Sequence, residues 1–105
     1  MRTAREIAAS YNRLLLNIWS GTDEEYPDLE SYINGLGMNP QYITEQGGRY
    51  RRDVGVALML AGGGPTVWLN TADGMIYAST SGECAGVGLF SEVSDEINDL
   101  FGIEY

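Results

Sequence analysis

The side chains that could do chemistry in this sequence are mostly carboxylates, and they gather in two runs. One run lies in residues 22–30 and the other in residues 91–101. Paired carboxylates can act as general acid and base in glycoside hydrolysis, but both runs fall on predicted exposed helix faces, where pKa values are rarely tuned. We therefore interpret them as a partner-binding surface: Asp23, Glu24, Glu25, Asp28, Glu30, Glu92, Asp95, Glu96 and Asp99. The alternative is a solvated surface that only keeps the protein soluble.

Other catalytic chemistry is scarce. The chain has no histidine, which excludes imidazole acid–base catalysis, Ser/His and Cys/His nucleophiles and the common zinc sites. Cys84 is the single cysteine, so no internal disulfide can form, and we expect a small buried or loop thiol. The segment 62–65 (Gly-Gly-Gly-Pro) lacks the Lys-Ser/Thr ending of a phosphate loop and precedes a strand. We predict a protein that is not an enzyme and uses no cofactor and no metal.

One basic cluster breaks the acidic pattern. Arg49, Arg51 and Arg52 supply three of the six cations. They can pair with the acidic runs, or they can grip a carboxylate or phosphate through two parallel hydrogen bonds. The second option makes a sensor of small anionic ligands an alternative function.

The net charge limits the partners. Fifteen acidic residues and six basic ones give a formal net charge of −9. This field repels phosphates, so we predict no direct binding of nucleic acid. It attracts basic protein surfaces, including the channels that hold DNA or RNA. No apolar run reaches the length of a membrane span, and the chain enters a helix pattern without a signal peptide. We expect a cytoplasmic protein without a membrane partner.

The stretch Asp53–Phe90 predicts the central sheet, because alternating apolar residues are separated by glycine turns. Short loops require antiparallel neighbours, so we predict a meander of four strands, with a fifth if 41–46 is an edge strand rather than a helical turn. The four expected strands are Val54–Ala61, Thr66–Asn70, Met75–Ser79 and Ala85–Phe90.

Three helices are expected around this sheet. Thr3 and Glu6 form a capping box, and apolar residues at helical spacing continue to Trp19. Pro27 suits the first turn of a second helix. Residues 91–101 form a third helix, with Ser91 or Ser94 as its cap. The whole chain, 1–105, is predicted to be one α+β domain.

The helices are expected to cover one face of the sheet. In the first strand, Val54, Val56, Leu58 and Leu60 fall on one face, and Ala57, Met59 and Ala61 fall on the other. A second copy of the chain could cover that other face. A homodimeric structural or interaction module is therefore a further alternative function.

Residues 65–101 also carry a family resemblance. A strand and Asp-Gly turn at Pro65–Gly74, a short strand at Met75–Ala78 and the acidic helix 91–101 resemble small anti-defence proteins of phages and mobile elements. These are the anti-CRISPR and antirestriction proteins. The resemblance implies an inhibitor in the host cytoplasm that binds a nucleic-acid-binding defence complex, in some cases as a DNA mimic. The predicted anchors beside the acidic runs are Trp19, Tyr26, Tyr32, Phe101 and Tyr105.

Overall fold

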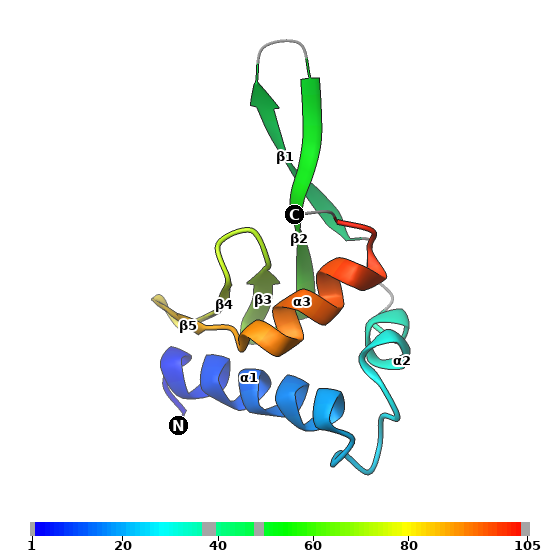
Figure 1. Ribbon diagram of the computed structural model, residues 1–105. Coiled ribbons are helices and arrows are strands. Elements are labelled where there is room, and N and C mark those ends of the chain that lie inside the picture. Colours follow the sequence, from blue (N-terminus) through cyan, green and yellow to red (C-terminus); the bar gives the residue numbers. More distant parts are fainter. Residues whose placement is uncertain (1, 37–39, 48–49, 104–105) are drawn as a thin grey trace.

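The computed structural model describes residues 2–36, 40–47 and 50–103. Its elements follow one another as two helices, five strands and a helix (Figure 1). In chain order they are α1 (Ala4–Ser20), α2 (Leu29–Asn34), β1 (Gln41–Gly47), β2 (Tyr50–Ala61), β3 (Thr66–Asn70), β4 (Met75–Thr80), β5 (Glu83–Gly88) and α3 (Ser91–Leu100). The predicted α+β class with an antiparallel sheet is confirmed.

The sheet is a meander in which every strand pairs with its chain neighbour, in the order β1-β2-β3-β4-β5. One row of paired residues crosses four strands, from Met59 through Trp68 and Tyr77 to Gly86. The ambiguous segment 41–46 lies in the edge strand β1. The hairpin of β1 and β2 projects away from the helices (Figure 1).

The core lies between the sheet and a helical layer formed mainly by α1 and α3 (Figure 1). Apolar side chains at helical spacing on α1 and α3 meet alternate residues of β2, β3 and β4, as the period of each element requires. Burying each large aliphatic side chain contributes about 1.5–3 kcal/mol to the free energy of unfolding. The largest fully buried apolar side chains are Leu15, Ile18, Val56, Val67, Leu69, Ile76, Val93 and Ile97.

Three buried polar side chains, Asn12, Thr71 and Asn98, fasten the helices to the sheet and its loops. The Asn12 amide nitrogen donates to the Gly88 carbonyl oxygen at 2.9 Å, and the Phe90 N–H donates to Asn12 Oδ1 at 3.3 Å. The Thr71 hydroxyl donates to Asn98 Oδ1 at 2.7 Å and accepts from the Val56 N–H at 2.8 Å. Such bonds satisfy groups that would be costly to bury unpaired, so they fix where α1 and α3 sit.

The structure confirms the predicted cap of the first helix. It corrects the predicted start of the second helix and the predicted cap of the third. Thr3 and Glu6 form the predicted capping box of α1. The second helix begins later than predicted, because Asp28 is its N-cap and Pro27 precedes it. The third helix has Phe90 at its N-cap position and no side-chain cap, so the prediction of a serine cap was wrong.

A bulge changes one predicted strand face. The pairing of β2 with β3 shifts between Met59 and Ala61, so that Ala61 pairs with Val67. Val67 points into the core, and Ala61 packs against the same core. The prediction that Ala61 shares a face with Met59 was wrong, since an extra residue reverses the alternation.

The opposite face of β2–β5 is covered by no described helix. Trp68 and Tyr77 stack there with ring centroids 5.5 Å apart, and a Cβ at Gly86 would meet the Tyr77 ring at 2.8 Å. The Tyr77 ring therefore occupies the space that a side chain at position 86 would need. By register, the part of this open face between Ala57 and Gly88 carries only uncharged residues: Ala57, Met59, Thr66, Trp68, Asn70, Met75, Tyr77, Ser79, Cys84, Gly86 and Gly88.

Candidate partner-binding site

The two acidic runs meet in space at a hollow of about 330 Å³. The end of α1 contributes Ile18 and Trp19, the start of α2 contributes Pro27 to Leu29, and α3 contributes Glu96. Asp28 and Glu96, which belong to different runs, thus line one surface depression. The lining thus combines two carboxylates with apolar side chains, which suits a partner that is both basic and apolar.

A second, smaller hollow of about 100 Å³ lies between α2 and the end of α3. Glu30, Ile33 and Asn34 line it from α2, and Leu100 and Phe101 line it from the other side. Figure 1 shows α2 beside the C-terminal ends of both α1 and α3. We call the two hollows together the α2 seam. Its defining residues are Trp19, Asp28, Glu30, Glu96 and Leu100.

Two of the predicted partner-binding carboxylates also hold the local backbone. Asp23 accepts from the N–H groups of Glu25 (3.0 Å) and Tyr26 (2.8 Å), which closes the turn before α2. Asp28 accepts from the Ser31 N–H at 2.8 Å as the helix cap. The hydrogen bonds from Ser31 lower the pKa of Asp28, so its negative charge is held at the helix N-terminus, where it is favoured.

The other predicted carboxylates are exposed on α2, α3 and the turn between α1 and α2. Within the described residues, the side-chain carboxylates of Glu24, Glu25 and Glu96 accept no hydrogen bond and form no ion pair. Their charges are therefore available to a partner. The exposed members of the predicted set are Glu24, Glu25, Asp28, Glu30, Glu92, Asp95, Glu96 and Asp99.

The aromatic anchors divide into exposed and buried side chains. Trp19 is 45% exposed at the first hollow, as the predicted contact role requires. Tyr32 is only 6% exposed, so its prediction as an anchor was wrong, and Tyr26 packs edge-on against it. Phe101 is partly buried and borders the second hollow. Tyr105 lies outside the described residues.

Leu100 is the exposed apolar residue that sequence reasoning missed. It is among the exposed large hydrophobic side chains and lines the second hollow. The helix period gave no signal of this exposure, because Leu100 follows Val93 by seven residues and Ile97 by three, which places it on the face of these buried residues.

In the described part of the chain, no group of three His, Cys, Asp or Glu side chains could hold a metal ion. Cys84 is exposed on β5, which corrects the expectation of a buried or loop thiol. Of the predicted basic cluster, Arg49 and the side chains of Arg51 and Arg52 lie outside the described residues.

Comparisons with protein-family models, with curated proteins and with solved structures gave no match. In the described residues, no helix is both long and apolar enough to span a bilayer.

Proposed function

We propose that this protein works by binding, through the α2 seam, to a basic surface on a protein that handles nucleic acid. One observation carries the proposal: acidic runs that are far apart in the sequence line one hollow beside an exposed tryptophan. A nucleic-acid-binding defence complex is the first partner class to test, because the family resemblance implies it.

The physical argument has an electrostatic part and an apolar part. Exposed carboxylates on a chain of net charge −9 speed the encounter with a basic surface and orient it. Exposed charge pairs add little affinity by themselves. Affinity therefore has to come from apolar anchors that become buried on binding, and Trp19 and Leu100 are placed for that role.

The test is a binding assay of the purified protein against CRISPR effector and restriction complexes, at low and at high salt. We expect affinity to fall as salt rises and duplex DNA to compete. Replacing Asp23, Glu24 and Glu25 together would also open the turn that Asp23 closes. The sharper variant is Glu24→Gln/Glu25→Gln/Glu96→Gln, which should weaken binding about tenfold or more.

Matched controls separate the seam from the overall charge. Glu96→Gln and Asp53→Asn each remove one exposed negative charge, but Asp53 lines neither hollow. Trp19→Ala and Met59→Ala each remove an exposed apolar side chain, and only Trp19 lies at the seam. Equal losses within either pair, or binding that ignores salt, would reject the seam as the contact.

The open face of the sheet favours a second candidate function, a homodimeric interaction module. Between Ala57 and Gly88, its strand positions carry no charged residue although a fifth of the chain is charged. Met59 is 38% exposed there. Two copies that repel one another at −9 each can approach most closely through a neutral face.

A further inference from the structure

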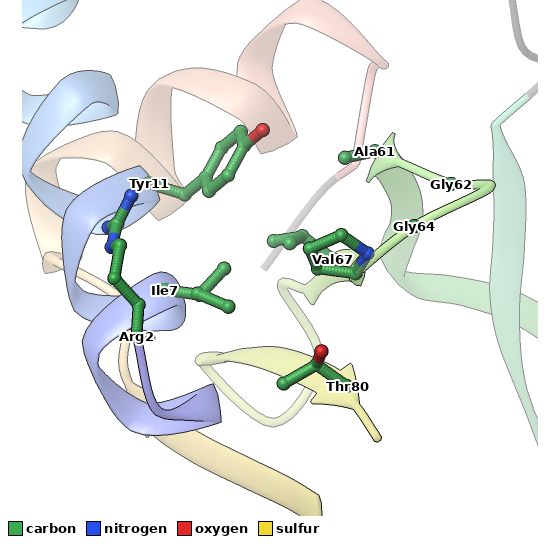
Figure 2. Close-up of a pocket in the computed structure, with 9 residues that line it drawn as sticks. Arg2, Ile7, Tyr11, Ala61, Gly62, Gly64, Val67 and Thr80 are labelled. Atoms are coloured by element: carbon green, nitrogen blue, oxygen red, sulfur yellow. The ribbon is translucent and has the colours of Figure 1, made fainter. Parts of the chain in front are cut away.

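A third hollow lies on the helical side of the sheet, away from the α2 seam. Its volume is about 410 Å³, which falls in the range of small-molecule sites. Figure 2 shows Ile7 and Tyr11 of α1 on one side of the hollow and Ala61, Val67 and the β2–β3 loop on the other, with Thr80 of β4 at one edge. Arg2, which also lines the hollow, runs along the start of α1 with its guanidinium beside Tyr11.

The bulge in β2 helps to build this hollow. Because the bulge turns Ala61 to the helical side, its methyl group joins Ile7 and Val67 as apolar lining. The glycines of the β2–β3 loop leave open space, since a Cβ at Gly62 or Gly64 would meet nothing within 4 Å. The floor is therefore apolar and the loop wall is bare backbone.

The polar groups at this hollow are one cation and two hydroxyl groups. The Arg2 guanidinium donates one hydrogen bond, to the Glu6 carbonyl oxygen at 3.3 Å. It makes no ion pair among the described residues, and the lining contains no carboxylate. The nearby Glu6 and Glu83 carboxylates accept hydrogen bonds from Thr3 and Ala4 at the start of α1.

We propose that this hollow binds a small monocarboxylic acid with an apolar body. The hydrocarbon part would lie against Ile7, Ala61 and Val67, where its burial is favourable. The carboxylate would meet Arg2, which can donate two parallel hydrogen bonds. The net charge of −9 repels anions at long range, but physiological salt screens charges beyond about 8 Å. The groups at the hollow therefore decide the affinity.

The test uses hexanoate as the probe and follows the backbone amide signals by NMR. We expect saturable shifts at Ile7, Val67 and Thr80 with a Kd of about 1 mM. Hexanol, which has the same chain without the charge, should bind about tenfold more weakly, and butanoate should also bind more weakly because it buries less apolar surface.

Two arginine variants test the role of the cation. Arg2→Gln should raise the Kd of hexanoate about tenfold, to the level of hexanol. Arg13→Gln removes another exposed arginine of α1 that does not line the hollow, and it should leave the Kd unchanged. Both variants are at exposed positions, and the NMR spectrum reports their folding directly.

The proposal is overturned if hexanoate produces no saturable shift at the lining residues up to about 50 mM. It is also overturned if hexanol binds as tightly as hexanoate, or if Arg13→Gln weakens binding as much as Arg2→Gln does. These outcomes do not depend on whether the α2 seam binds a basic partner.

Discussion

Tyr32 is a core residue that carries a titratable group. Its ring packs edge-on against Tyr26, with centroids 4.9 Å apart. Burial raises the pKa of its hydroxyl group to about 12, and the neighbouring Tyr11 and Tyr26 hydroxyl groups add to the rise. The neutral hydroxyl is thus part of what keeps α2 packed on α1.

This raised pKa predicts the response of stability to alkali. Because the folded pKa lies above the ordinary value of 10.0, the stabilising contribution of neutral Tyr32 is complete below about pH 10. It is lost as the pH rises to about 12. Denaturant unfolding at a series of pH values should therefore show a free energy of unfolding that falls across this window.

Tyr32→Phe should make that fall shallower, while Tyr42→Phe, at an exposed tyrosine, should not change it. Part of the fall should remain in Tyr32→Phe. The reason is that the hydrogen bond from the Tyr77 hydroxyl to Asp73, 2.6 Å long, raises the pKa of Tyr77 as well. An unchanged slope in Tyr32→Phe would contradict the assignment.

At the scale of elements, β2 and the β3–β4 turn approach each other closely at Gly55. A Cβ built on Gly55 would lie 2.5 Å from the Ala72 backbone nitrogen and 2.7 Å from the Ala72 Cβ. The next residue, Val56, exchanges hydrogen bonds with Thr71 in the same turn. The turn is therefore seated directly on the strand.

Gly55→Ala should force these two segments apart. We expect the free energy of unfolding to fall by about 2 kcal/mol or more, as in other overpacked sites, measured by urea denaturation. Gly88→Ala is the matched control on the same sheet, because a Cβ there would meet nothing within 4 Å. Equal effects of the two substitutions would show that the contact with Ala72 relaxes without cost.

At the scale of the whole molecule, we expect salt to have opposite effects on partner binding and on self-association. Binding of the α2 seam to a basic partner should weaken as salt rises, because salt screens attraction. Self-association through the open face should strengthen, because salt screens the repulsion between two copies of net charge −9. Sedimentation velocity over a range of protein and salt concentrations measures the second effect.

One lysine substitution on each surface distinguishes the role of the open face from that of the α2 seam. Met59→Lys, on the open face, should abolish any dimer and leave partner binding intact. Trp19→Lys, on the seam, should abolish partner binding and leave any dimer intact. Both residues are exposed apolar side chains in the free chain. A dimer that survives Met59→Lys, or a chain that stays monomeric at every salt concentration, would remove the homodimer from consideration.

Local patterns in the sequence were enough to predict each element by itself. The helical spacing of apolar residues and the Thr3–Glu6 box predicted α1, and the Asp73-Gly74 turn predicted the pairing of β3 with β4. These features depend on neighbouring residues, so the sequence contains their cause. The net charge, the lack of histidine and the class of fold also follow from the sequence alone.

Only the tertiary structure decided what these elements bring together. The bulge in β2 turned Ala61 toward α1, and the helical layer brought Asp28 to Glu96. Each depends on how layers pack and on where one extra residue shifts a register. Neither the packing of layers nor a shift of register is encoded in a local period. The sequence therefore predicted which acidic residues are candidates, and only the fold placed Asp28 and Glu96 in one hollow.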